Sequence, residues 1–208
     1  MPKKIFITGI STEVGKTLVS AICVEALKAD YWKPIQAGEL SFSDADRVKA
    51  LVSNSQTNIH EITYELTTPM SPHAAADIDG VLVKTSNLNV PTTENRIVIE
   101  GAGGVLVPVN HHETILDIIP KEALVVVVSR HYLGSINHTL LTLELIKRRG
   151  FEPVLIFSGN EHPTTEEIIK KMSGVKVIGR VDQEEIIDKV VVRKYADLFK
   201  EKLEHELK

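Results

Sequence analysis

The sequence comprises 208 residues, of which 43% are hydrophobic and 25% are charged, and its formal net charge at pH 7 is −4. This composition is typical of a globular protein, and the length, with no evident linker, predicts one domain spanning residues 1–208. The slight negative charge argues against nucleic acid as a partner, because nucleic-acid binding calls for a basic face. A single cysteine excludes an internal disulfide, and no apolar run resembles a signal peptide or a membrane span, so we expect a cytoplasmic protein without a membrane partner.

Six short apolar runs alternate with segments of helical periodicity. The runs predict strands over residues 4–8, 31–35, 96–100, 123–128, 153–157 and 175–179. Several are apolar at successive positions, as in "ALVVVV", which is typical of strands covered on both faces. Strands that alternate with helices form parallel sheets with right-handed crossovers. The sequence therefore predicts an α/β fold of three layers, in which helices flank a mostly parallel central sheet.

Helices are predicted where apolar side chains recur at helical spacing, over residues 18–27, over residues 193–207 and in a segment that Gly150 ends. The buried face of that middle helix is expected to carry Ile136, Leu140 and Leu143. Residues 56–95 have no clear pattern, and the stretch "NLNVPTTENR" is expected to form a loop.

The stretch "GISTEVGKT", residues 9–17, lies between the first predicted strand and the first predicted helix. Ligands of such sheets bind beyond the carboxyl ends of the strands, and the two glycines would let backbone N–H groups surround a phosphate at the positive end of the helix. Lys16 would reach the terminal phosphates, and the hydroxyl of Thr17 would bind Mg²⁺. Five residues rather than the usual four separate the glycines, so the alternative is a glycine-containing turn with an incidental lysine.

A magnesium ion held by Thr17 also needs carboxylates, because hard cations prefer oxygen ligands. Glu100 ends an apolar strand in "RIVIEGAGG" and would reach the phosphate side of the sheet. In "SFSDADRVKAL" we expect Asp46 to be the second carboxylate, although Asp44 and Asp46 could merely cap a helix. Lys33 follows "YW" near the end of the second predicted strand, where it could neutralise a phosphoryl group during transfer.

Five segments match, in order and approximate spacing, segments of the dethiobiotin synthetases: "FITGISTEVGKT", "WKPIQAG", "SPHAAA", "VIEGAGGVLVPV" and "LGSINHTLLTLE". The sequence resembles this family over roughly residues 3–160, and the five-residue interval in the phosphate loop is typical of it. The resemblance implies the P-loop NTPase fold and a homodimeric ligase of biotin biosynthesis, with ATP and Mg²⁺ as cofactors and the small molecules 7,8-diaminopelargonate and CO₂ as substrates.

The reaction implied by the resemblance begins with a carbamate, formed from CO₂ and one amine of the substrate. ATP phosphorylates the carbamate to a carbamic-phosphoric anhydride, and the second amine closes the ring of dethiobiotin, releasing ADP and phosphate. A carbamate that attacks a triphosphate brings two anions together, so the catalyst must be cationic and preorganised. Lys16, Lys33 and Mg²⁺ would supply that charge.

The resemblance also implies roles for individual residues. Catalysis would fall to Lys33, Lys16 and Thr12. The nucleotide would bind to Glu13, Val14, Gly15, Lys16, Thr17 and, at the adenine, Asn160, whereas Leu18 belongs to the helix. The metal ligands would be Thr17, Asp46 and Glu100. The substrate carboxylate would bind across the dimer interface at a helix start formed by Gly134, Ser135 and Asn137. Ser135 could equally be a plain N-cap.

Three features depart from the family pattern. Ala37 in "KPIQAG" stands where many members have serine or threonine, which puts a hydroxyl contact to the substrate in doubt. Residues 38–46 form a short segment, so either Asp44 or Asp46 could be the magnesium ligand. The stretch "GRVDQEE" lacks the proline-bearing loop common near the adenine, which leaves base selectivity open.

Other classes of function have signatures that this sequence lacks. A ParA-like switch ATPase carries a lysine early in the phosphate loop, where this sequence has Ile10, Ser11, Thr12 and Glu13. A GTPase would carry an Asn-Lys-x-Asp motif, and a small-molecule kinase an arginine-rich lid. His111 and His112 have no further histidine or cysteine at the spacing of a zinc site, and Cys23 is expected to be an inert thiol in the core.

Overall fold

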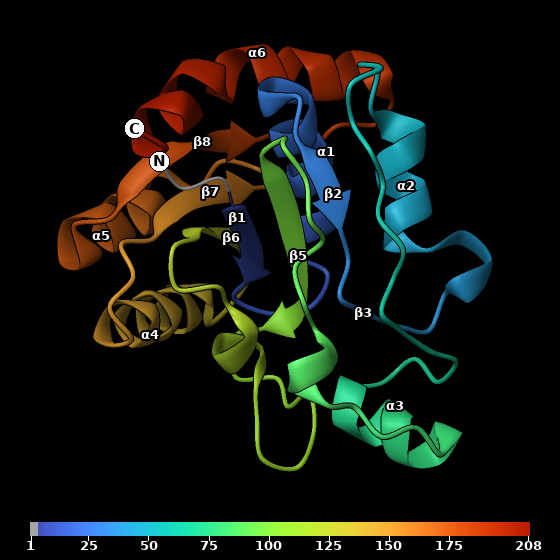
Figure 1. Cartoon of the computed structure of the whole chain (residues 1–208). Coiled ribbons are helices and arrows are strands. Elements are labelled where there is room, and N and C mark those ends of the chain that lie inside the picture. Colours follow the sequence, from blue (N-terminus) through green and yellow to red (C-terminus); the bar gives the residue numbers. More distant parts are fainter. Residues whose placement is uncertain (1–3) are drawn as a thin grey trace.

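The structure is a computed structural model that describes residues 4–208. Its main sheet has six strands in the spatial order β2-β5-β1-β6-β7-β8, and every neighbouring pair is parallel (Figure 1). The strands are β1 (Lys4–Gly9), β2 (Asp30–Trp32), β5 (Ile97–Gly104), β6 (Leu124–Arg130), β7 (Val154–Ser158) and β8 (Lys176–Val181). Each of them overlaps one of the six predicted strands, which confirms the parallel sheet.

Helices cover both faces of this sheet, with α1 (Lys16–Leu27) and α6 (Lys189–Glu206) on one face and α4 (Ser135–Arg148) and α5 (Pro163–Ser173) on the other (Figure 1). A further helix, α2 (Asp44–Leu51), packs beside α1. The three-layer α/β architecture expected from the sequence is therefore confirmed. Within residues 4–208, no helix combines the length and the apolarity needed to cross a membrane.

The apolar runs are buried because helices cover both faces of the sheet. Residues 124–128 of β6 are at most 6% exposed, and Val19, Ile22 and Cys23 of α1 are fully buried against the sheet. Burial raises the pKa of the Cys23 thiol to about 12. This cysteine is therefore protonated at neutral pH and unreactive, as expected from its position in the first helix.

The strand predicted over residues 31–35 is interrupted. β2 stops before Lys33, and after Pro34 the chain enters β3 (Ile35–Ala37), which pairs with β4 (Tyr64–Leu66) in a separate two-stranded sheet. Pro34 has no N–H to donate to a neighbouring strand, so a continuous strand through this point is unfavourable. The prediction of one strand here was wrong, and the break places Lys33 at the carboxyl edge of the main sheet.

The segment without a clear pattern contains β4 and α3 (Pro72–Asp79). This helix begins with a proline, whose fixed φ suits the first helical turn, and ends at Gly80 with a φ of 68°. It lies outside the main sheet, next to β3 and β4 (Figure 1). Residues 88–96 contain no helix or strand, in agreement with the predicted loop. Three 3₁₀ helices complete the part of the chain that the structure describes: Leu40–Phe42, Thr85–Asn87 and Ile115–Ile118.

The buried face of α4 differs from the prediction. Leu143 is buried as expected, but Ile136 is 36% exposed. The face toward the sheet is formed by Ser135, Thr139, Thr142, Leu143 and Ile146. Thr139 Oγ1 donates to the carbonyl oxygen of Ser135 at 2.6 Å and lies 2.8 Å from Ser129 Oγ. These hydroxyls are buried with their hydrogen bonds made, so the apolar stripe that contains Ile136 is left at the surface.

Candidate active site

The connection between β1 and α1 has the backbone geometry of a phosphate-binding loop. Glu13 and Gly15 both have positive φ, 55° and 93°, so the chain turns sharply before α1 begins. A Cβ atom on Gly15 would lie 2.8 Å from Ser158 Oγ, which explains why glycine is needed at this point. The loop ends at the N-terminus of α1, where free N–H groups and the helix dipole favour an anion.

Lys16, the first residue of α1, is 8% exposed, and its Nζ donates to the carbonyl oxygen of Ser11 at 3.0 Å. Burial lowers its pKa from 10.5 to about 8, although the charge of Glu100 partly opposes this effect. At neutral pH the ammonium is therefore mostly charged but poorly solvated. A polyanion bound beside it would replace the lost solvation, which suits contact with a triphosphate.

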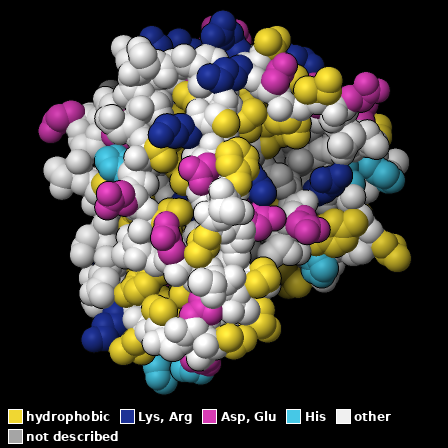
Figure 2. All heavy atoms as spheres, turned by 90° about the vertical axis from the view of Figure 1, so that its right-hand side faces the viewer, with side chains coloured by type: hydrophobic (Ala, Val, Ile, Leu, Met, Phe, Trp, Pro, Cys, Tyr) yellow, Lys and Arg dark blue, Asp and Glu magenta, His cyan; other side chains and the backbone are white. Residues whose placement is uncertain are grey.

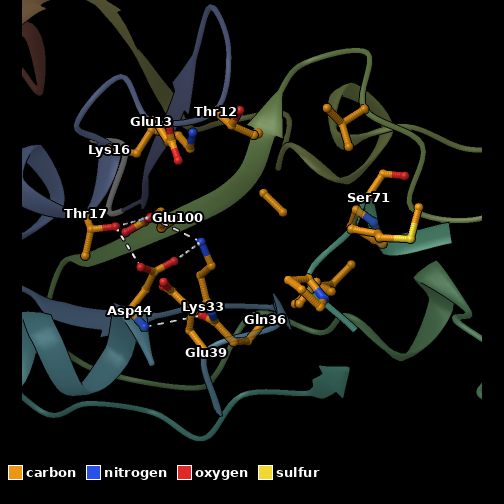
Figure 3. A pocket seen from close by; sticks show the side chains of 18 of the residues that line it. Thr12, Glu13, Lys16, Thr17, Lys33, Gln36, Glu39, Asp44, Ser71 and Glu100 are labelled. Atoms are coloured by element: carbon orange, nitrogen blue, oxygen red, sulfur yellow. Dashed lines mark hydrogen bonds and ion pairs between the residues drawn. The ribbon is translucent and has the colours of Figure 1, made fainter. Parts of the chain in front are cut away.

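Next to the loop, four side chains from separate elements meet (Figure 3). Lys33 Nζ lies 2.8 Å from Asp44 Oδ2 and 3.1 Å from Glu100 Oε1. The hydroxyl oxygen of Thr17 lies 2.9 Å from Asp44 Oδ1 and 3.0 Å from Glu100 Oε1. Lys33 follows β2, Glu100 is in β5, Thr17 is in α1, and Asp44 begins α2. The structure thus brings the expected site residues Thr17, Lys33 and Glu100 together.

The charges in this cluster hold one another in place. Lys33 is 4% exposed and Glu100 is 1% exposed. Burial alone would lower the pKa of Lys33, but the charges of Glu100 and Asp44 outweigh burial and raise it. For Asp44, burial works in the opposite direction, but the charge of Lys33 lowers the pKa of this carboxyl. The Tyr31 hydroxyl donates to Glu100 Oε2 at 2.8 Å, and burial raises the pKa of Tyr31 well above its ordinary value.

Asp46, the carboxylate expected to bind the metal, is not part of the cluster. Its Oδ2 accepts hydrogen bonds from Ser43 N at 2.9 Å and Ser43 Oγ at 2.7 Å, which completes a capping box at the start of α2. Asp46 is exposed, whereas the carboxylate of Asp44 reaches Thr17 and Lys33. The structure therefore places Asp44, and not Asp46, beside Thr17 and Lys33, so Asp44 is the one of the two carboxylates that could hold a metal there.

The oxygen atoms of Thr17, Asp44 and Glu100 fit a magnesium ion. Both carboxylates approach the Thr17 hydroxyl to 3.0 Å or less, and oxygen is the ligand that Mg²⁺ prefers. Among residues 4–208, no three His, Cys, Asp or Glu side chains are grouped so that they could hold a metal ion by themselves. Two carboxylates and a hydroxyl leave room for water and phosphate oxygens, so the site suits an ion that binds together with a nucleotide.

The cluster lines a cavity of about 720 Å³. Figure 2 shows the face that carries α2 and α3, hollowed near its centre, where basic and acidic side chains lie close together. Further lining residues include the expected Thr12 and Glu13 and also Ala37, the position of the doubtful hydroxyl contact. The sequence did not point to four other lining residues: Gln36, Glu39, Arg47 and Ser71. Gln36 Oε1 accepts a hydrogen bond from the backbone N of Asp44 at 3.3 Å. A glutamine within a short apolar strand was the available signal for this position.

The remaining expected site residues lie outside this cavity. Asn160 lines a neighbouring cavity of about 240 Å³, beside Ser158. Gly134, Ser135 and Asn137 line another, of about 840 Å³, at the N-terminus of α4. Gly134, not Ser135, is the N-cap residue of this helix. Within one chain, the helix start expected to bind the substrate carboxylate is therefore separate from the phosphate cavity.

Solved structures with a similar fold include a plasmid partition protein and a ParA family ATPase. The chain matches a plasmid partition protein from Borrelia burgdorferi with a TM-score of 0.59 and 14% identity, covering 98% of this chain and 99% of that one. It matches a ParA family ATPase from Chlorobium tepidum with a TM-score of 0.56 and 13% identity, covering 95% and 94% of the two chains. At such low identity the likeness shows the shared fold alone.

Sequence relatives are much closer. Residues 3–191 match the family model described as an AAA domain. The chain is 59% identical over 204 residues to a protein of Christiangramia forsetii named ATP-dependent dethiobiotin synthetase BioD, covering 98% of this chain and 99% of that protein. It is 48% identical to the protein of the same name from Cytophaga hutchinsonii, covering 93% and 95%. With such identity over nearly the full length, the chain belongs to the family of ATP-dependent dethiobiotin synthetases.

Proposed function

We propose that this protein is a dethiobiotin synthase that uses ATP and Mg²⁺ to carboxylate 7,8-diaminopelargonate with CO₂ and to close the ureido ring. One observation carries the proposal, the convergence in a single cavity of two buried lysines with two carboxylates and a hydroxyl beside the phosphate loop. The names of the relatives that are 59% and 48% identical support the same activity.

The proposed reaction has three steps. One amine of the substrate takes up CO₂ and loses a proton, which gives a carbamate. A carbamate oxygen then attacks the γ-phosphorus of ATP, and the bond between this phosphorus and the β-phosphate oxygen breaks. ADP departs, and a carbamic-phosphoric anhydride has formed. Finally the second amine attacks the carbonyl carbon, phosphate departs, and the proton of the amine passes to water or phosphate. Each step changes the negative charge that the oxygen atoms of the reactants carry. The protein therefore acts mainly by positioning the reactants and by stabilising this charge.

The two lysines supply fixed positive charge where the carbamate and the triphosphate meet. Lys33 stays protonated because Glu100 and Asp44 raise its pKa, and it would stabilise the phosphoryl group in transfer. Lys16 would lie between the carbamate and the γ-phosphate, and Thr12 at the carbamate end of the same cavity. Magnesium bound through Thr17, Asp44 and Glu100 would neutralise charge on the β- and γ-phosphates.

The nucleotide would extend from the phosphate loop into the neighbouring cavity. Residues 13–17 would surround the phosphates, since the loop and the start of α1 present N–H groups there. Asn160 would contact the adenine, because its cavity is also lined by Ser158, whose Oγ lies 2.8 Å from the point where a Cβ atom on Gly15 would be.

A homodimer would complete the site. Leu133 is fully exposed, and Leu141 and Met172 are each more than half exposed, so the outer side of α4 and α5 presents apolar side chains that a second copy could cover. The start of α4, with Gly134 and Asn137, lies apart from the phosphate cavity of its own chain. We therefore infer that the α4 N-terminus of one subunit binds the substrate carboxylate while the amines react in the other subunit.

The proposal is tested by incubating the purified protein with 7,8-diaminopelargonate, bicarbonate, ATP and Mg²⁺. We expect release of one phosphate per dethiobiotin, with the product identified by mass spectrometry. Replacing Lys33 with methionine should abolish the product, whereas the same change at Lys171, an exposed lysine of α5, should leave the rate unchanged. Because removal of Lys33 leaves the buried carboxylate of Glu100 and the partly buried one of Asp44 without their cation, folding of this variant is verified by circular dichroism.

The main alternative is a switch ATPase like the ParA protein that shares the fold. Such a protein would hydrolyse ATP at a rate that does not depend on the diamine. ATP turnover without diamine dependence and without product would therefore contradict the proposed function. Loss of product in the Lys33 variant together with retained ADP binding would assign this residue to the chemical steps.

A further inference from the structure

One arginine connects the phosphate cavity with the cavity that contains Asn160. β6 ends at Arg130, and among residues 4–208 this is the one residue that lines both the cavity of about 720 Å³ and the cavity of about 240 Å³. The smaller cavity lies beyond the carboxyl ends of β6, β7 and β8, with Ser158 against Gly15 of the phosphate loop. A nucleotide with its phosphates in the loop and its base in the smaller cavity has to pass Arg130.

The side chain of Arg130 is held in a defined position. Its Nη2 donates to Gln183 Oε1 at 2.9 Å, so the guanidinium spans from the end of β6 to the loop after β8. Arg130 Cγ and Nε lie 3.7 Å from the point where a Cβ atom on Gly159 would be. Gly159 has a φ of 87° and no side chain, which leaves the guanidinium lying over bare backbone. Arg130 therefore lies close to the backbone of Gly159, where it lines both cavities.

The positive charge of Arg130 is not neutralised by a carboxylate. Within the described part of the chain, Arg130 appears in none of the ion pairs, and its partner Gln183 is uncharged. The nearby Arg180 differs, because it pairs with Glu161, Glu166 and Asp182 at distances between 2.7 and 3.4 Å. The charge of Arg180 is thus neutralised by carboxylates of the same chain, whereas Arg130 presents an exposed cation between two cavities.

We propose that Arg130 is a nucleoside-binding residue on whose flat cationic face the base of the nucleotide stacks, held in place by Gln183. Stacking of bases on arginine and other planar groups contributes substantial binding energy, and a purine offers a larger face than a pyrimidine. Arg130 therefore favours purine nucleotides over pyrimidine nucleotides. This inference rests on the proposed function only in taking a nucleoside triphosphate as the substrate.

Direct binding measurements test the proposal without the diamine. The full-length protein and its Arg130→Ala and Arg130→Lys variants are titrated by calorimetry with ADP, CDP and tripolyphosphate. Both variants should bind ADP roughly tenfold more weakly, bind CDP with a smaller loss, and bind tripolyphosphate like the wild type. Lysine should fail because it keeps the charge but has no planar face. Arg193→Ala, an exposed arginine of α6, is the matched control and should change none of the three affinities.

Each other outcome overturns the stacking role. Wild-type affinity for ADP in Arg130→Ala would show that the side chain does not contact the nucleoside. Recovery of affinity in Arg130→Lys, or an equal loss for tripolyphosphate, would assign the residue to the phosphates instead. These results are separate from the proposed function, since a wild-type protein that binds ADP but makes no dethiobiotin contradicts the function alone. In the synthase assay Arg130→Ala should raise the KM for ATP and leave kcat close to the wild-type value.

Discussion

Replacing Lys16 with methionine should abolish synthesis yet stabilise the nucleotide-free protein. Burial lowers the pKa of Lys16 from 10.5 to about 8. Each pKa unit corresponds to about 1.4 kcal/mol, so keeping this ammonium in the folded protein at pH 7 costs about 3 kcal/mol. Methionine retains a side chain of similar length without the charge. The free energy of unfolding should therefore rise by up to about 3 kcal/mol.

The difference in the free energy of unfolding between Lys16→Met and the wild type should become smaller as the pH rises. The folded pKa of Lys16 is below its unfolded value, so the destabilisation is fully present below about pH 8 and is lost as the pH rises toward 10.5. Between these values the unfolded wild-type chain binds more protons than the folded one, and the wild type gains stability relative to the variant. At pH 10 the gap should shrink to about 1 kcal/mol.

Urea unfolding followed by circular dichroism, at pH 7 and pH 10 without nucleotide, measures both quantities. All other titrating groups are shared by the two proteins, so their contributions largely cancel in the difference. Lys171→Met, an exposed position on α5, is the control and should shift the curve little at either pH. A Lys16→Met variant no more stable than the wild type at pH 7, or a gap equal at both pH values, would refute the view that Lys16 is buried with its charge.

Three further predictions concern the ligands and the assembly. Nucleotide affinity, measured by calorimetry, should fall about tenfold per pH unit above pH 8, because Lys16 must regain a proton to contact the phosphates; a constant affinity up to pH 9.5 would contradict this. Asp44→Asn should raise the Mg²⁺ concentration for half-maximal synthesis at least about tenfold, whereas Asp46→Asn should leave it unchanged, and the reverse pattern would restore Asp46 as the ligand. Leu133→Asp should yield monomers in sedimentation that bind ADP but make no dethiobiotin, whereas a fully active variant would argue against a shared site.

Features that depend on residues close to one another in the sequence could be predicted from the sequence. The run of residues 124–128 is apolar at every position, and it is a strand covered on both faces. The interval from Gly9 to Thr17 contains the glycines, the lysine and the hydroxyl of a phosphate loop in one stretch. The break at Pro34 was missed because the apolar pattern runs through it, although proline cannot donate to a neighbouring strand.

The choice between Asp44 and Asp46 could not be made from the sequence. Both lie in the first turn of α2, two positions apart, so they point to nearly opposite sides of the helix. Which of them faces Thr17 depends on how the helix is rotated, and burial of Ala45 and Val48 against the core sets that rotation. Similarly, the apolar spacing of residues around Ile136 predicts a buried face of α4, but in the structure Ser135 and Thr139 lie on the side that faces the sheet.

By itself, the sequence determined where along the chain the six strands of the main sheet and the phosphate loop lie, because contiguous residues specify their own hydrogen-bonding pattern and burial. Only the tertiary structure decided which distant groups meet. Thr17 and Glu100 are 83 positions apart, Lys33 and Glu100 are 67 apart, and Arg130 reaches a loop 53 positions further along the chain. Such contacts depend on strand order and on the rotation of each packed helix, and these are set by the core as a whole.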